Sequence, residues 1–293
     1  MGGTCLDLIV EAPVYRPPVE ASSLIVQAVL GCPWNKCLFC YLYKTRRFRV
    51  RGLDELLESI RLAGAFYSDF VYSVFLADGN VITLRNEYTK SLLKELYKAF
   101  PKLGRVSCYG GARFIVRKGL QKVEELAELG LKKVYMGLES GDDEVLKFMN
   151  KGATVQDMVE ASRILHRAGV ELSLTVILGL AGRGRALRNA ELTARAVNMM
   201  MPSELRIHTL ILSPQAPLFN YYLKGLFQEA DWREVLTEAK RLIECIEVPV
   251  KVYSHASNYV YVSGQLPRDR ERMLRTLDRA LEDPSIVNFD RCL

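Results

Sequence analysis

The sequence predicts an α/β fold, namely a partial (β/α)6 barrel of the TIM type followed by a C-terminal α+β appendage. Strand-length apolar runs alternate with amphipathic segments of helical period, and several of the runs are hydrophobic throughout, as in strands covered on both faces. The 293 residues, 49% of them apolar, suffice for one barrel of about 200–250 residues and an addition. We expect an N-terminal extension at 1–21, a core barrel at 22–215 and the appendage at 216–293.

Six apolar segments have the length and composition of strands. They are Leu24–Leu30, Val71–Ala77, Arg105–Tyr109, Lys133–Leu138, Glu171–Leu178 and Leu205–Leu212. The amphipathic segments between them predict helices at Leu53–Ala65, Tyr88–Phe100, Gln121–Leu129, Val155–Ala168 and Ala186–Met200. Because ligands of parallel α/β folds gather at the carboxyl ends of the strands, we expect the chemistry in the loops that follow them.

The regular alternation stops after Pro214. The remaining sequence predicts helices at Trp232–Ile246 and Arg268–Leu281 and extended segments at Val248–Tyr253 and Tyr259–Val262. The polar run from His255 to Tyr259 has two interpretations, a loop that lines a substrate pocket or a turn bonded to its own backbone.

The chain carries a mildly basic net charge of +6, which leaves room for an anionic substrate without requiring one. Basic residues concentrate between Lys44 and Arg51, either as a solvated loop or in contact with an anionic group. No stretch approaches the roughly 18 apolar residues of a membrane helix, and the N-terminal sequence lacks a signal-peptide profile. We expect a cytoplasmic protein without a membrane partner.

Three of the seven cysteines, Cys32, Cys37 and Cys40, fall within nine positions directly after the first predicted strand. In a reducing compartment such a cluster is typical of metal binding. Three thiolates can bind three irons of a [4Fe-4S] cluster and leave the fourth iron open. A structural zinc site would need a fourth ligand, and the histidines are distant in sequence. The other cysteines are isolated and are interpreted as buried structural thiols: Cys5, Cys108, Cys245 and Cys292.

The triplet resembles the signature of the radical S-adenosylmethionine (SAM) superfamily, Cys-x3-Cys-x2-Cys with an aromatic residue before the last cysteine. Phe39 occupies the aromatic position. Four residues rather than three separate Cys32 from Cys37, which leaves the subfamily open. The resemblance implies a [4Fe-4S] cluster whose open iron binds SAM and cleaves it reductively.

Two further strand ends match places where this superfamily contacts SAM. Asp78, Gly79 and Asn80 stand where members have a Gly-Gly-Glu-like turn at the SAM amino group; a simple tight turn is the alternative. Tyr109 ends the third strand, where relatives place a polar SAM contact.

Residues 134–152 resemble the branch that contains oxygen-independent coproporphyrinogen dehydrogenase, the methylthiotransferases and the Elongator catalytic subunit. By that resemblance Glu139 binds the SAM ribose and Lys151 the SAM carboxylate; a helix cap and a surface residue are the alternatives. The fifth strand ends like the adenine-binding strand of the superfamily. Gly179 matches its glycine, Ile177 would pack on adenine, and Thr175 points the same way by the period of two; core packing is the alternative for Ile177.

The resemblance spans about residues 22–215 and implies a 5′-deoxyadenosyl radical that abstracts hydrogen from a substrate. It also implies a one-electron donor of the ferredoxin or flavodoxin type. Because the sequence has no second cysteine cluster and no broad basic stripe, we expect a small-molecule or cofactor-precursor substrate rather than nucleic acid. An enzyme that modifies RNA or protein is the alternative, and so is a non-catalytic iron–sulfur protein for electron transfer or binding.

Overall fold

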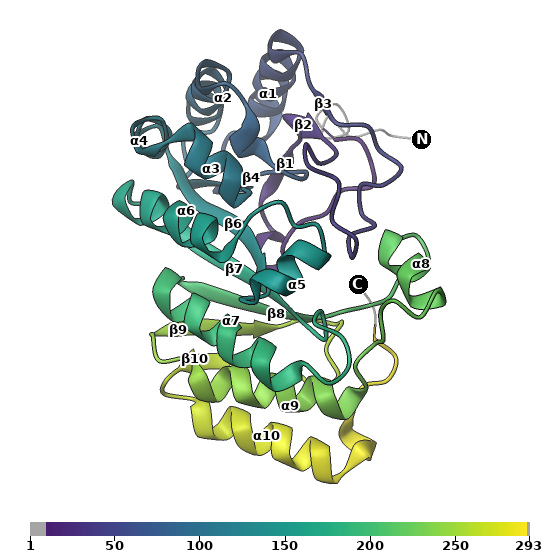
Figure 1. Cartoon of the computed structure of the whole chain (residues 1–293). Helices are drawn as coiled ribbons and strands as arrows, with labels where there is room; N and C mark the ends of the chain where they lie inside the picture. The colour runs from purple at the N-terminus through teal and green to yellow at the C-terminus, as the bar shows by residue number, and fades with distance from the viewer. Residues whose placement is uncertain (1–9, 292–293) are drawn as a thin grey trace. The chain divides into compact units, whose positions relative to one another are not determined.

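A computed structural model describes residues 10–291, so Cys5 and Cys292 lie outside the described residues. The chain forms two compact units (Figure 1). Of the described residues, the first contains 10–35, 45–135 and 164–171, and the second contains 36–44, 136–163 and 172–291. Strand β6 (Leu131–Glu139) begins in the first unit and ends in the second.

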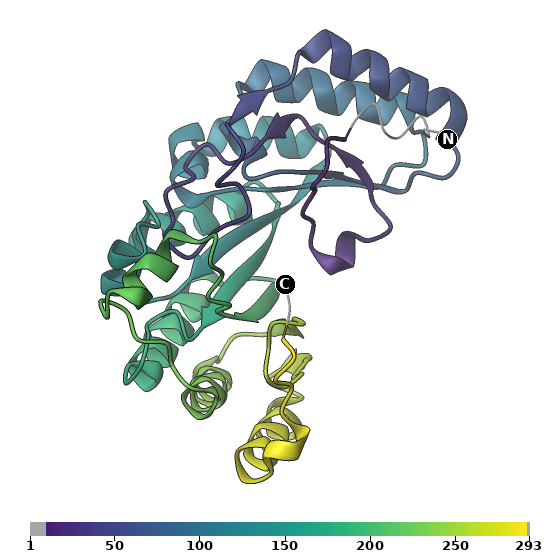
Figure 2. The same ribbon diagram turned by 90° about the vertical axis from the view of Figure 1, so that its right-hand side faces the viewer.

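The first unit is built on parallel strands in the order β1, β4, β5 and β6. The first three are Leu24–Val26, Ser73–Leu76 and Arg105–Tyr109. Its helices are α1 (Leu53–Tyr67), α2 (Asn86–Ala99), α3 (Ala112–Lys118) and α4 (Leu120–Glu128). Helices α1 and α2 pack side by side, as Figures 1 and 2 both show. A two-stranded antiparallel ribbon, β2 (Val29–Leu30) and β3 (Arg49–Val50), flanks the loop of the cysteines.

The N-terminal segment completes the core of this unit. Val14 and Val19 pack on a buried cluster that includes Phe75 and Tyr135. The fully buried carboxylate of Glu20 accepts hydrogen bonds from Tyr135 Oη at 2.5 Å and Ser107 Oγ at 3.0 Å. Arg105 donates to its other oxygen at 3.1 Å. Apolar contact and hydrogen bonding together therefore fix this segment to strands β4, β5 and β6.

The second unit contains β7 (Glu171–Leu178), β8 (Glu204–Thr209) and β9 (Val250–Ser254), paired in parallel, with β10 (Gly264–Leu266) antiparallel to β9. Its helices are α5 (Asp143–Phe148), α6 (Val155–Arg167), α7 (Ala186–Met200), α8 (Pro217–Leu223), α9 (Trp232–Cys245) and α10 (Arg270–Glu282). Helix α9 begins at a capping box, in which Asp231 and Glu234 satisfy each other's free amides. It packs between α7 and α10.

The predicted α/β class is confirmed, with four differences in detail. The expected strand at 24–30 divides into β1 and β2, because the carbonyl of Val26 accepts from Ala77 N while that of Ala28 accepts from Arg51 N. The sixth strand ends at Thr209, and 259–262 is not a strand, since Val262 N donates to the Ser254 side chain instead. The short helices α3, α5 and α8 were not predicted, because fewer than two full turns leave little periodicity. Within residues 10–291 no helix is long and apolar enough to cross a membrane.

Candidate active site

In the first unit the turn after β4 lies directly against the first cysteine. The amide of Gly79 donates to the carbonyl of Gly31 at 3.1 Å. A Cβ on Gly79 would lie 2.7 Å from both the Cα and the Cβ of Cys32, closer than real Cβ atoms come. Glycine is therefore required here because the turn and the cysteine backbone approach too closely for a side chain.

Asp78 holds this arrangement together. Its fully buried carboxylate accepts from Gly31 N at 2.8 Å, from Gln27 Nε2 at 3.3 Å and from Arg46 Nη1 at 3.4 Å. Burial raises the pKa of Asp78, while these three donors oppose the rise. Since protein donors occupy both carboxylate oxygens, the side chain fixes the cysteine loop rather than presenting a free acceptor.

Asn80 is the residue of this turn that offers an acceptor. The residue is 2% exposed, and its Oδ1 is buried without a hydrogen-bond partner among the described residues. Such an orphaned acceptor costs about 1–3 kcal/mol unless a ligand satisfies it. An ammonium group is a donor of the required kind, so this position fits a ligand such as the amino group of SAM.

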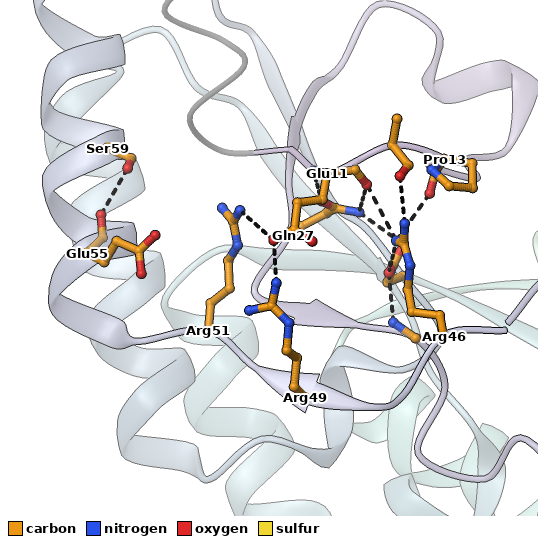
Figure 3. Close-up of polar contacts among 11 residues, drawn as sticks. Glu11, Pro13, Gln27, Arg46, Arg49, Arg51, Glu55 and Ser59 are labelled. Atoms are coloured by element: carbon orange, nitrogen blue, oxygen red, sulfur yellow. Dashed lines mark hydrogen bonds and ion pairs between the residues drawn. The ribbon is translucent and has the colours of Figure 1, made fainter.

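The basic segment that follows the cysteines is bound by the protein itself (Figure 3). Arg46 donates to the carbonyls of Ala12 at 2.7 Å and Pro13 at 3.3 Å. Arg49 and Arg51 both contact the carboxylate of Glu11, and the hydrogen bond from Arg49 lowers the pKa of Glu11. These guanidinium groups are therefore largely engaged by the N-terminal segment.

In the second unit an ion pair lies beside the other two cysteines. Lys151 Nζ is 2.6 Å from Glu139 Oε1, and both side chains are largely buried. Burial disfavours the charge of Lys151, but Glu139 and the thiolates of Cys37 and Cys40 more than compensate and raise its pKa. The structure thus brings four predicted site residues together. Glu139 does not cap the next helix, because Asp142 does so, and Lys151 is not a surface residue.

The loop that carries Cys37 and Cys40 is anchored at the two residues between them. Leu38 N donates to the carbonyl of Met149 at 2.9 Å, and its own carbonyl accepts from Leu218 N at 2.9 Å. Leu38 and Phe39 pack on a buried apolar cluster that includes Met149. Phe39 therefore stiffens the loop through packing.

No three His, Cys, Asp or Glu side chains among the described residues converge on a point that could hold one metal ion. A zinc ion needs ligands about 2.0–2.3 Å from a single centre. A [4Fe-4S] cluster binds each thiolate to a different iron and so does not need the three thiols to converge on one point, and thiolate is the donor type that these cysteines supply.

The end of β7 presents the predicted nucleoside-binding residues. Thr175 and Ile177 are half-buried on one face, while Leu174 and Val176 are buried on the other. Gly179 follows with φ +77°, a conformation that suits glycine. In the first unit, Tyr109 is half-buried and lies edge-on to Phe75, with ring centroids 5.1 Å apart.

Backbone strain gathers around the candidate residues. Among the described residues, five that are not glycine have positive φ angles, and four of them are site residues or lie within two positions of one: Asn35, Asp78, Glu139 and Asn150. Positive φ values cost free energy in L-residues, and they persist where the surrounding structure enforces a functional geometry. Their position supports these loops as the functional part of the molecule.

A stacked pair of histidines was not predicted. The register places His208 of β8 opposite Ile177, and its ring stacks on that of His255 with centroids 4.2 Å apart. Burial, together with His255 and Arg206, lowers the pKa of His208 to about 3, so it is neutral at physiological pH. The segment at 255–259 forms a turn bonded to itself, since Asn258 N donates to the His255 carbonyl and Ser257 N to His255 Nδ1.

A parallel α/β fold with a cysteine loop after a strand is typical of enzymes that bind a cofactor at the carboxyl ends of their strands. The family model described as the radical SAM superfamily matches residues 26–188. The chain belongs to this superfamily, whose cofactors are a [4Fe-4S] cluster and SAM.

Curated relatives are distant. A tRNA uridine(34) acetyltransferase of Methanocaldococcus infernus is 23% identical over 127 residues, which are 42% of this chain and 24% of that protein. An uncharacterized protein of Methanocaldococcus jannaschii is 24% identical over 135 residues, 46% of this chain and 38% of the other. This chain therefore matches less than half the length of either relative.

Solved structures share the fold. Methylornithine synthase has a TM-score of 0.53 at 16% identity, covering 88% of this chain and 80% of that one. Elp3 of Methanocaldococcus infernus has a TM-score of 0.52 at 14% identity, covering 80% and 59%. The methyltransferase TsrM of Kitasatospora setae, with cobalamin and a [4Fe-4S] cluster bound, has a TM-score of 0.53 at 19% identity, covering 66% and 38%. These similarities confirm the predicted fold class.

Proposed function

We propose that the protein uses a cluster held by Cys32, Cys37 and Cys40 to cleave SAM reductively and to abstract a hydrogen atom from a substrate. When bound, the cluster and SAM supply one-electron cleavage of the sulfonium bond, which yields methionine and a 5′-deoxyadenosyl radical. The observation that carries the proposal is the buried Lys151–Glu139 pair next to Cys37 and Cys40. It supports the proposal because an ammonium group can pair with a carboxylate and a carboxylate can accept from hydroxyls, and both are near two of the cysteines.

The remaining candidate residues have roles that match their surroundings. Lys151 would pair with the SAM carboxylate and Glu139 would accept from the ribose hydroxyls. The unsatisfied Oδ1 of Asn80 would accept from the SAM ammonium, while Gly79 allows the close approach. The half-buried face of Thr175 and Ile177 would receive the adenine, and Tyr109 would make a weaker polar contact.

For the substrate we propose a small molecule or cofactor precursor. Arg46, Arg49 and Arg51, the basic segment nearest the cysteines, contact Glu11, Asp78 and backbone carbonyls. They are therefore poorly placed to bind an RNA backbone. An RNA base is the second candidate, favoured by the relatives named tRNA uridine(34) acetyltransferase. A ferredoxin or flavodoxin in the cytoplasm would supply the electron.

The test of SAM cleavage uses anaerobically reconstituted protein with SAM and dithionite. We expect 5′-deoxyadenosine in the wild type and none in a variant with all three cysteines changed to alanine. An intact cluster without any 5′-deoxyadenosine would contradict the proposal and favour an electron-transfer protein.

The test of the substrate class compares 5′-deoxyadenosine formation after adding total tRNA with that after adding a fraction of small metabolites. Stimulation by the metabolites supports the small-molecule proposal, and stimulation by tRNA alone favours the second candidate.

A further inference from the structure

A buried carboxylate of the C-terminal region reaches two of the proposed SAM-binding segments. Glu238 lies in the middle of α9 and is 1% exposed. Its Oε2 accepts from the amide of Gly179 at 2.7 Å, and its Oε1 accepts from Asn189 Nδ2 at 2.5 Å. Both carboxylate oxygens of Glu238 therefore accept a hydrogen bond, and both donors lie outside α9.

Asn189 extends the chain of hydrogen bonds to the strand of Glu139. Its Oδ1 accepts from Ser140 Oγ at 2.5 Å, and Ser140 Oγ in turn accepts from the amide of Asp142 at 3.0 Å. One helical turn later, Thr193 Oγ1 accepts from the amide of Gly141 at 2.8 Å. Helix α7 therefore holds the two residues that follow Glu139 through side chains on one face.

The network reaches Ser140, the neighbour of Glu139, at one end and Gly179 at the other, and Glu139 and Gly179 both have positive φ angles. Glu139 has φ +65° and Gly179 has φ +77°. A Cβ on Gly179 would lie 3.3 Å from Val235 of α9, so the helix packs directly against this turn. An amide at a strand end needs an acceptor when it is buried, and here the acceptor is the Glu238 carboxylate.

We propose that Glu238 is a positioning residue for SAM: by holding Gly179 directly and Ser140 through Asn189, it fixes the turns that present Ile177 and Glu139 to the nucleoside. The inference rests on the proposed function. Asn189 and Glu238 both lie beyond residues 26–188, the part that matches the family model. The C-terminal region thereby contributes to the SAM site, a role that the superfamily match does not assign.

Burying an acidic group costs free energy unless hydrogen bonds compensate it. The hydrogen bonds to Gly179 and Asn189 therefore explain why a carboxyl group is tolerated at position 238. Burial raises the pKa of Glu238 to about 7, against the opposing bonds from Asn189 and the Gly179 amide, and Glu234 one turn earlier adds to the rise. Asp142, whose amide joins this network, has its carboxylate paired with Arg185 and Arg188.

The test compares Glu238→Leu, Glu238→Gln and Asn189→Ala with the wild type in anaerobically reconstituted protein. Leucine keeps the volume and leaves the Gly179 amide and Asn189 Nδ2 without an acceptor. Since a lost buried hydrogen bond to a charged group is worth about tenfold or more, we expect Glu238→Leu to raise the KM for SAM about tenfold while kcat changes less. Asn189→Ala should have a smaller effect, because it leaves the Gly179 contact in place.

Glutamine can restore the network, because its oxygen accepts from Gly179 while its amide donates to a rotated Asn189 side chain. We expect Glu238→Gln to bring the KM back to within about threefold of the wild type. The matched control is Glu244→Gln, which alters a carboxylate of the same helix that pairs with Arg241; it should leave the KM unchanged. Iron content must equal that of the wild type in every variant.

The inference is overturned if Glu238→Leu and Asn189→Ala bind SAM as the wild type does, or if glutamine fails to rescue a protein with an intact cluster. Absence of SAM cleavage in the wild type would instead overturn the proposed function. Should Glu238→Leu fail to fold, Asn189→Ala alone decides, because it removes the link to Ser140 and leaves the carboxylate in place.

Discussion

At the scale of single residues, the site is defined by which side chains have a partner and which lack one. Lys151 and Glu139 are paired near thiolates, Asp78 is saturated by protein donors, and Asn80 Oδ1 lacks a partner among the described residues. The Lys151–Glu139 pair is suited to form new ion pairs with a charged ligand. Asp78 is suited to hold the cysteine loop, and Asn80 Oδ1 is suited to accept a hydrogen bond from a ligand.

The charge on Lys151 leads to the first prediction. We expect Lys151→Met to raise the KM for SAM by roughly ten- to a hundredfold, because an ion-paired hydrogen bond to the SAM carboxylate is lost. The raised pKa of Lys151 keeps it protonated through neutral pH, so the wild-type KM should not change with its titration below about pH 9. The measurement is 5′-deoxyadenosine formation against SAM concentration. The exposed Lys147→Met is the control, and a normal KM in Lys151→Met would contradict the assignment.

The close approach of Gly79 to Cys32 leads to the second prediction. An added methyl group would meet the Cys32 backbone at 2.7 Å, so Gly79→Ala must displace the first cysteine. We expect the iron content after reconstitution to fall to less than about half of the wild-type value, since one cluster ligand is misplaced. At Gly104 the nearest atom to an added Cβ lies at 3.7 Å, and Gly104→Ala should retain full iron content. Equal iron contents in the two variants would show that the turn does not position Cys32.

At the scale of elements, the helices of the second unit act as supports for strand ends. Helix α9 begins at its own capping box, packs on α7 and directs Glu238 to the turn after β7. The amphipathic pattern that forms the helix also requires its inward face to be apolar. Glu238 places a carboxyl group on that buried face, and its ionisation is therefore expected to affect the stability of the fold.

Glu238 gives the third prediction, which concerns pH. Its pKa is about 7 in the folded protein and 4.5 in the unfolded chain. The associated stability is fully present below pH 4.5 and is lost as the pH rises through 7, because the unfolded chain releases its proton first. We expect the free energy of unfolding of the wild type, relative to Glu238→Gln, to fall by roughly 3 kcal/mol between pH 4.5 and 8.

Anaerobic urea unfolding of both proteins across this range measures the difference. The glutamine variant is the necessary reference, because His208, with its pKa lowered to about 3, makes stability increase with pH up to about 6.5. Parallel curves for the two proteins would show that folding does not shift the pKa of Glu238.

At the scale of the whole molecule, we expect the protein with its cluster bound to be more stable against unfolding than the protein without it. A ligand that binds the folded protein and not the unfolded chain stabilises the folded state. The fourth prediction is that the melting temperature of the reconstituted protein is at least about 4 °C above that of the apoprotein. We also expect the reconstituted protein to bind SAM and the apoprotein not to bind it.

The measurement is anaerobic thermal unfolding, with equilibrium dialysis of SAM on the same samples. The variant lacking all three cysteines should melt like the apoprotein whether or not iron and sulfide are supplied. If the apoprotein binds SAM as tightly as the reconstituted protein does, the cluster does not anchor SAM.

By itself, the sequence determined the α/β class, the cysteine loop and the strand ends at which site residues stand, because periodicity and short motifs are local. It did not determine the short helices, the division of the first strand, or what each side chain contacts. Only the tertiary structure paired Lys151 with Glu139, stacked His208 on His255 and brought Glu238 to Gly179. The last two contacts join residues 47 and 59 positions apart, where parallel strand register and helix packing decide which side chains meet.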